Sequence, residues 1–287
     1  MIRCRVAAWV VAGAVAVTSA LVSPEALATT EVEWREVCTI DDDRLVEISG
    51  MAMSNTHANV MWFTNDSGDE ARLYAVDIGT CRTVGEVRLR GVRARDFEGL
   101  SSSTAGDGRA FLWIGDIGDN RDSWPDISIY RIREPRELGL RNRKPRQWRF
   151  TYPDRPHNAE TLMVQGERTW VATWQLASGG LYSVPLSRGT SIARRVADVG
   201  ALTTDGAINP SGTGYVLRDY LDVHVFRGLP PGRRIATFAL PTQVQGEAVT
   251  WTRDGRGLFI ASEKDARLLR VDLPPWVLTA LDPPGRR

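Results

Sequence analysis

The 287-residue chain contains only two lysines, three histidines and three cysteines. The histidines, His57, His157 and His224, are too few for a histidine-rich metal site. Neither a Gly-x-Ser-x-Gly motif nor a phosphate-binding Gly-Lys-Ser/Thr loop occurs, so no local signature supports a nucleophile elbow or a P-loop. Beyond the first 28 residues the sequence shows no sustained helical periodicity, which disfavours a mostly helical fold.

The chain also lacks an excess of charge once its N-terminus is set aside. That segment contributes Arg3, Arg5 and Glu25, and the remainder carries 34 basic and 34 acidic residues. A net charge of zero provides no long-range field for nucleic acid or for anionic lipid. We therefore expect neither as a partner.

The N-terminus has the pattern of a secretory signal peptide. Two arginines precede an apolar run over residues 6–22, and Ala26-Leu27-Ala28 forms a small-residue cleavage site. The alternative is a membrane anchor, but the run is shorter than the ~20 residues that a spanning helix needs. Residues 1–28 are thus predicted to be removed, leaving residues 29–287 as a single, secreted, monomeric domain that does not insert into a membrane.

Two cysteines, Cys38 and Cys81, follow the predicted cleavage site. An even pair in an exported protein predicts a disulfide. Two thiolates are too few for a cysteine metal site.

Five segments share one pattern, in which a polar residue, a small residue and an apolar strand are followed by a tight turn and further strands. They cover residues 47–53, 96–102, 158–164, 203–209 and 245–251. Four strands per repeat, at spacings of 42 to 62 residues, predict an all-β fold, a five-bladed β-propeller.

The fifth repeat lacks a fourth strand, and residues 31–40 resemble the missing one. Pairing the two ends of the chain would close the ring and remove its exposed sheet edges. The longest spacing contains a basic, proline-containing stretch at 133–146, which we interpret as an exposed loop of the second blade. Six blades, the alternative, would require further strands there.

The third residue of each segment falls at the same place in every repeat. These residues are Ser49, Glu98, Glu160, Asp205 and Glu247. Because strands alternate faces with period two, the residues two positions earlier point the same way. Those residues are Glu47, Asp96, Asn158, Thr203 and Gln245. In a propeller the first strand of each blade lines the axis, so we expect two stacked polar rings there.

The loops on one face should surround the mouth of this channel. They contribute Asp66, Asp116, Asp119, Asn120, Arg218, Asp219 and Glu263. Four carboxylates and one hydroxyl in the inner ring would repel one another without a cation or water. Such an oxygen-only set suits calcium better than zinc. The alternative is that these side chains bond the amides of neighbouring blades.

The inner ring resembles the arrangement of calcium-activated apyrases, five-bladed propellers with one ligand per blade. Their pattern is Ser, Glu, Glu, Ser, Glu, so Asp205 departs from it, and the family's nucleotide-binding residues have no match here. Separately, Arg95-Asp-Phe-Glu-Gly-Leu100 and Gly115-Asp-Ile-Gly-Asp-Asn120 resemble secreted bacterial phytase-like or esterase-like propellers. The first resemblance implies an axial calcium position, and the second implies the fold.

These patterns predict a secreted calcium-dependent hydrolase of phosphoester or other oxygen-rich substrates. Calcium would orient an anionic substrate, and Asp116, Asp219 or His157 would transfer protons. The competing hypothesis is a non-catalytic propeller that binds a glycan, a peptide or a protein, with a structural ion. Fold class alone does not choose between them.

Overall fold

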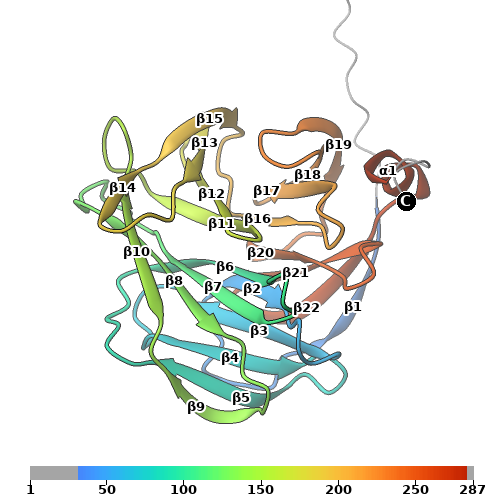
Figure 1. Cartoon of the computed structure of the whole chain (residues 1–287). Helices are drawn as coiled ribbons and strands as arrows, with labels where there is room; N and C mark the ends of the chain where they lie inside the picture. The colour runs from blue at the N-terminus through green and yellow to red at the C-terminus, as the bar shows by residue number, and fades with distance from the viewer. Residues whose placement is uncertain (1–31, 283–287) are drawn as a thin grey trace, which may run out of the picture.

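The computed structural model describes residues 32–282, and in it five small sheets surround a central axis as the blades of a β-propeller (Figure 1). The predicted signal peptide, residues 1–28, lies outside the described residues. Within residues 32–282 no helix is long and apolar enough to cross a membrane.

Each blade is built around antiparallel neighbours that follow one another in the chain. Blade 1 contains β2 (Ile48–Met53), β3 (Val60–Asn65), β4 (Arg72–Asp77), β5 (Arg82–Leu89) and β9 (Gly139–Arg143). Blade 2 contains β6 (Phe97–Thr104), β7 (Ala110–Asp116), β8 (Ile127–Arg133), β10 (Arg146–Thr151) and β14 (Thr190–Ile192). Blade 3 contains β11 (Ala159–Gln165), β12 (Arg168–Thr173), β13 (Gly179–Val184) and β15 (Arg194–Val199). Blade 4 contains β16 (Asp205–Ile208), β17 (Gly214–Arg218), β18 (Asp222–Arg227) and β19 (Arg233–Ala239).

Blade 5 joins the two ends of the described chain. It contains β20 (Gln245–Trp251), β21 (Gly257–Glu263), β22 (Asp265–Asp272) and β1 (Glu33–Thr39). β1 pairs antiparallel with β22, so closure by the N-terminal strand is confirmed. A helix, α1 (Pro275–Leu281), follows and packs against β18 and β19.

The predicted disulfide between Cys38 and Cys81 is confirmed, with the two Cα atoms 6.1 Å apart. It joins β1 of blade 5 to the turn before β5 of blade 1, and therefore fastens the closing strand to the first blade. The sequence separation of 43 residues makes the enclosed loop long enough to stabilise the fold by about 4 kcal/mol through the entropy of the unfolded chain.

The structure corrects the interpretation of residues 133–146 as a loop within blade 2. This stretch includes β9, which leaves blade 2 and pairs in parallel with β5 as the fifth strand of blade 1. β14 does the same one blade later, where it pairs in parallel with β10. These strands link neighbouring blades at their outer edges, and the described residues form five sheets, without a sixth blade.

The hydrophobic core is divided into five clusters, each of which lies between two neighbouring blades. Near the axis the inner strands approach so closely that small residues are required. A Cβ on Gly50 would lie 2.6 Å from the Glu98 carbonyl oxygen, and one on Gly99 would lie 2.5 Å from Leu162. Both glycines directly follow a residue of the predicted axial ring, so this tight contact fixes where the ring side chains point.

Candidate functional site

The five ring residues lie on the five innermost strands, as the repeat predicts. Ser49 is on β2, Glu98 on β6, Glu160 on β11, Asp205 on β16 and Glu247 on β20. These strands contact one another in a closed circle around the axis.

Two ring members bond the backbone of a neighbouring blade. The Ser49 hydroxyl donates to the carbonyl oxygen of Phe97 at 2.7 Å. The Val249 amide donates to Asp205 Oδ2 at 2.7 Å. Both side chains therefore connect inner strands, whatever else they do.

The three glutamates of the ring have no such backbone partner among the hydrogen bonds of the described residues. Burial, followed by the charges of Asp66 and Glu160, raises the pKa of Glu98 well above its ordinary value. Burial and the neighbouring Glu247 carboxylate likewise raise the pKa of Glu160. Burial raises the pKa of Glu247 from 4.5 to about 7. Ionising these channel carboxylates without a bound cation is therefore unfavourable, because the charged groups are desolvated.

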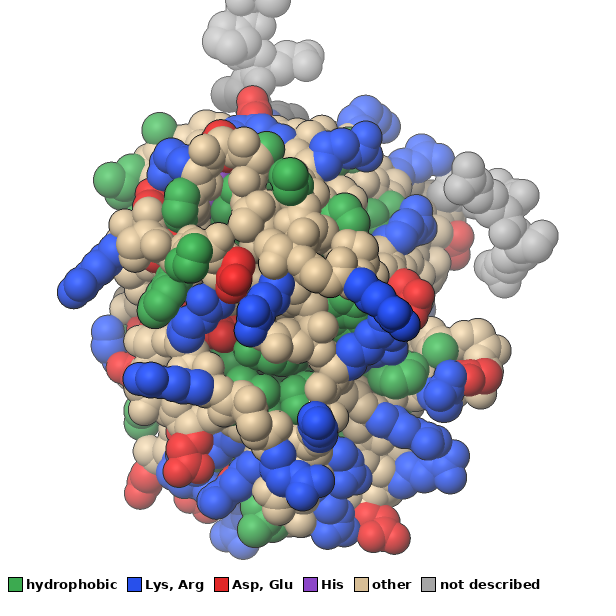
Figure 2. Space-filling model, turned by 60° about the vertical axis from the view of Figure 1, so that its left-hand side comes forward, with side chains coloured by type: hydrophobic (Ala, Val, Ile, Leu, Met, Phe, Trp, Pro, Cys, Tyr) green, Lys and Arg blue, Asp and Glu red, His purple; other side chains and the backbone are tan. Residues whose placement is uncertain are grey.

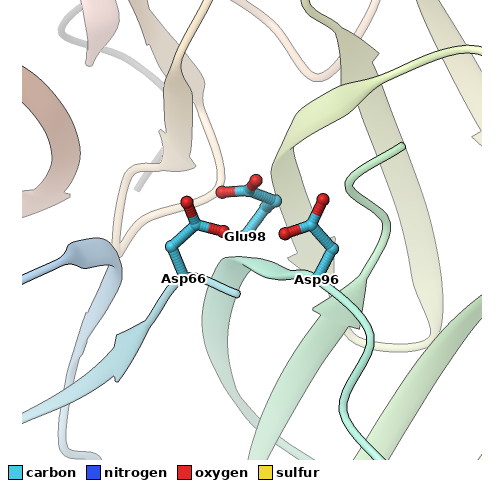
Figure 3. A group of neighbouring side chains, drawn as sticks. All are labelled: Asp66, Asp96 and Glu98. Atoms are coloured by element: carbon cyan, nitrogen blue, oxygen red, sulfur yellow. The ribbon is translucent and has the colours of Figure 1, made fainter. Parts of the chain in front are cut away.

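The structure brings Asp66, predicted at the mouth, and Asp96, of the second polar ring, close to Glu98 of the inner ring. One carboxylate oxygen each from Asp66, Asp96 and Glu98 lie within 4.8 Å of one another. Figure 3 shows the three carboxyl groups converging, with Asp66 in the loop after β3, Asp96 directly before β6 and Glu98 on β6. Burial and the nearby Asp66 carboxyl raise the pKa of Asp96 to about 8. Gly118 leaves room for this group, because a Cβ there would overlap the Asp96 carboxyl.

Several carboxylate oxygens in the channel are buried and have no hydrogen-bond partner within residues 32–282. They are Oδ1 of Asp96, Oε2 of Glu160 and Oδ1 of Asp205. A buried acceptor without a partner is costly, and a cation would satisfy several at once. The residues therefore fit a bound ion with oxygen ligands, for which calcium is the best match by ligand chemistry.

Two asparagines connect the acidic groups of blades 2 and 3. Asn120 donates through Nδ2 to Asp96 Oδ2 at 3.5 Å, and Asn158 Nδ2 lies 3.4 Å from both Asn120 Oδ1 and Glu160 Oε1. The predicted mouth residue Asn120 is therefore part of the channel network. Asp119 has a different position, since its carboxylate accepts the Ser123 and Trp124 amides within its own loop.

Arg218, predicted at the mouth, is fully buried at the end of β17. Its Nη1 donates to the Ala248 carbonyl oxygen and to Gln243 Oε1, both at 3.1 Å. Burial lowers its pKa to about 10, so the guanidinium remains charged at neutral pH. The charges of Glu247 and Asp205 act in the opposite direction and favour its charged form. Gly246 leaves room for the buried guanidinium, because a Cβ on residue 246 would overlap it.

Glu263, predicted at the mouth, and Glu47, of the second polar ring, differ in exposure. Glu263 ends β21, is buried, and has a pKa raised by burial and by Asp66. Glu47 is exposed, and its carbonyl oxygen accepts the Asp66 amide at 2.9 Å. Glu47 therefore helps to place Asp66 through its backbone.

Each of the three proton-transfer candidates is held by hydrogen bonds to its own surroundings. Asp116 Oδ1 accepts the amides of Arg95 at 3.0 Å and Asp96 at 2.8 Å. Asp219 accepts the amides of Leu221 and Asp222 and contacts His224. His157 is buried, with Nε2 at 3.0 Å from Asp154 Oδ2. Asp116 thus positions the chain at Asp96, and the catalytic role of all three stays a prediction.

Sequence reasoning missed the aromatic and apolar side chains of the mouth. Trp174 Nε1 donates to the Tyr220 hydroxyl at 3.3 Å. Burial, then the charges of Glu247 and Glu160, raise the Tyr220 pKa, which places this tyrosine beside the channel acids. Trp174 directly follows β12 and Tyr220 lies two residues after β17, so both are in the loop after a second strand, as Asp66 is, and that position in the repeat could have identified them.

The same face carries one large exposed apolar side chain per blade, between 40% and 81% exposed. They are Val46, Trp124, Leu176, Leu221 and Val244. Each lies in a loop that enters a first strand or leaves a second strand, which are the loops of the mouth. We call these five residues the apolar rim.

No protein-family model matches the chain, and no curated protein matches it. Among solved structures, a glutaminyl cyclase from Myxococcus xanthus aligns with a TM-score of 0.51 and 13% identity over 85% of this chain and 100% of that one. A gluconolactonase from Xanthomonas campestris aligns with a TM-score of 0.49 and 14% identity over 87% and 92%. At such identities the likeness shows the fold alone. The resemblance to phytase-like propellers and to apyrases stays a prediction.

Proposed function

We propose that this protein is a calcium-dependent hydrolase that binds one Ca²⁺ in the axial channel and acts outside the cell on phosphoester or other oxygen-rich substrates. The observation that carries the proposal is the set of buried channel carboxylates, three of whose oxygens have no hydrogen-bond partner in the part of the chain that the structure describes. The signal-peptide pattern and the disulfide support export.

Asp66, Asp96 and Glu98 would form one side of the ion site, and Glu160 and Glu247 the other. When bound, the ion would supply charge stabilisation for a substrate oxygen. Asp116 and Gly118 hold Asp96 in place, and Asn120 and Asn158 hold the two sides together through their amides. Tyr220 and Trp174 provide hydrogen-bonding and apolar contacts for a substrate at the mouth.

Calcium calorimetry on chelator-stripped protein tests the metal site. Tight one-site binding is expected for the wild type. Glu98→Gln or Asp96→Asn should weaken calcium affinity by about tenfold or more. Glu70→Gln is the matched control, since Glu70 is an exposed carboxylate in the loop after β3 on the same face. Absence of binding heat, or equal loss in the control, contradicts an axial calcium site.

The apolar rim favours a second candidate function, a non-catalytic propeller that holds a partner over the mouth. Single exposed apolar residues are ordinary, but one in every blade on one face presents a repeated contact surface. A calcium-supplemented screen of phosphatase, esterase and glycosidase substrates separates the two. Turnover that disappears in Glu98→Gln supports the hydrolase, whereas no turnover with intact calcium binding favours the binding protein.

A further inference from the structure

Although the chain as a whole is nearly neutral, its charges are unevenly placed. Residues 131–149 contain eight basic and two acidic side chains. The two acids already have partners: Glu134 accepts from Trp62 Nε1 at 2.8 Å, and Glu137 pairs with Arg141 at 3.1 Å. Figure 2 shows Arg and Lys side chains gathered over the lower half of this side of the molecule, where Figure 1 has β5, β9 and β10.

A hollow of about 670 Å³ lies on this side, between β10 and the segment that leads into β14. Its lining has no acidic side chain and includes Arg146, Arg149, Arg188, Ser187, Thr190 and Trp148. It forms because β14 of the blade 3 segment pairs in parallel with β10, which places Thr190 opposite Arg149. Arginines with adjacent hydroxyls are the donors that phosphate and sulfate groups prefer.

The three arginines of this hollow are exposed, and none has an ion-pair partner within 4.0 Å among the described residues. Basic side chains on edge strands also discourage pairing with other sheets. That role explains charge along the edge, but it does not require a hollow with hydroxyl groups and no acid. An anionic ligand accounts for both the basic charge and the acid-free hollow lined by hydroxyl groups.

A second hollow, of about 240 Å³, is lined by Arg133, Arg136 and Arg143 together with Glu134, whose carboxylate is already bonded. Arg143 and Arg146 are three residues apart, which spans at most about 10 Å of chain. The two hollows therefore lie within reach of one extended ligand with repeated anionic groups.

We propose that the two arginine-lined hollows, which together we call the basic edge, bind a linear polysaccharide that carries sulfate or phosphate groups. A single-stranded nucleic acid would need exposed aromatic rings for base stacking, but Trp148 is buried, with the Arg146 guanidinium 4.5 Å from its ring centroid. A flat bilayer would not reach into concave sites. The proposal is independent of the channel function.

Heparin binding, measured by calorimetry and by the salt needed for elution, tests this inference. Arg146→Gln/Arg149→Gln/Arg188→Gln is expected to weaken binding at least about tenfold at physiological salt. The slope of log affinity against log salt should fall by about 2 to 3, because three contacts are lost. The corresponding triple lysine variant should retain most of the affinity, since it keeps the charges.

Arg227→Gln/Arg233→Gln/Arg234→Gln is the matched control, because it removes three exposed arginines from blade 4. The proposal is overturned if this control loses as much heparin affinity as the Arg146/Arg149/Arg188 variant, or if that variant loses none. Inorganic sulfate should bind only in the millimolar range; affinity equal to that for heparin would show a simple ion site instead. Tighter binding to an RNA oligomer or to anionic phospholipid vesicles would also overturn it.

Discussion

Raising the pH should destabilise the calcium-free protein, which is opposite to the usual effect of ionising a carboxylate that has a cationic partner. Glu247 has an ordinary pKa of 4.5 and a pKa of about 7 in the folded channel, and Asp96 changes from 3.8 to about 8. The folded state therefore binds protons that the unfolded chain has already released. This stabilisation is complete below about pH 4 and is lost as the pH rises through 7 and 8.

For Glu247, each pH unit between the two values is worth about 1.4 kcal/mol, which gives about 3 kcal/mol in total. In a domain of this size, 1 kcal/mol changes Tm by roughly 2–4 °C, and about 2.6 kcal/mol of the total is lost above pH 5, so Glu247 alone should lower Tm by roughly 5–10 °C between pH 5 and 9. Calcium should oppose the loss, because it binds the ionised carboxylates. At a concentration 100 times its Kd it contributes about 2.7 kcal/mol.

Thermal unfolding in chelator and in calcium, at pH 5, 7 and 9, measures both effects. Glu247→Gln cannot titrate at this position, so its Tm in chelator should depend less on pH than that of the wild type. A Tm in chelator that stays constant or rises from pH 5 to 9 would refute the assignment of protonated carboxylates to the channel.

Three further predictions concern single contacts. Cys38→Ser/Cys81→Ser should lower the free energy of unfolding by about 4 kcal/mol in urea denaturation, and reduction of the wild type should have the same effect; an unchanged midpoint would contradict it. Arg218→Met should destabilise the fold by roughly 1–3 kcal/mol in the same assay, because the buried Ala248 carbonyl oxygen and Gln243 Oε1 lose their donor; a neutral result would show that the guanidinium contributes no net stability. Asp116→Asn retains an oxygen for the Arg95 and Asp96 amides and should keep calcium affinity, whereas Asp116→Ala should weaken it about tenfold in calorimetry. Equal affinities for the alanine and asparagine variants would remove Asp116 from the support of the ion site.

The propeller and its ring were predictable because each feature occurs five times. One acidic or hydroxyl side chain at the same place in every repeat identifies the axis, and a missing last strand indicates closure by the first. β9 was not predictable in this way. Its sequence, Gly-Leu-Arg-Asn-Arg, has no apolar alternation, since it joins blade 1 through backbone pairing with β5.

The positions of side chains that depend on packing between blades were also not predictable from the sequence. Asp66 joins Glu98 because of how the loop after β3 folds over the next blade, and a sequence pattern does not contain that distance. Arg218 ends a strand beside acidic loop residues, so it was expected at the surface, but Gly246 of the next blade creates space for its burial. The apolar rim was overlooked because an isolated exposed leucine or valine carries no information until the blades are superposed.

The acidic channel and the basic edge should bind their ligands independently. β10 and β14, which carry or adjoin the arginines of the larger hollow, are the fourth and fifth strands outward from the axis in blade 2, and three to four strand spacings of about 4.8 Å place them about 14–19 Å from β6. This is about two Debye lengths at physiological salt, so the charge of a calcium ion on the axis is largely screened through solvent. Heparin affinity should therefore be the same, within about a factor of two, in calcium and in chelator. A larger difference would show that the ion changes the arrangement of the blades, because direct electrostatics is too weak at this distance.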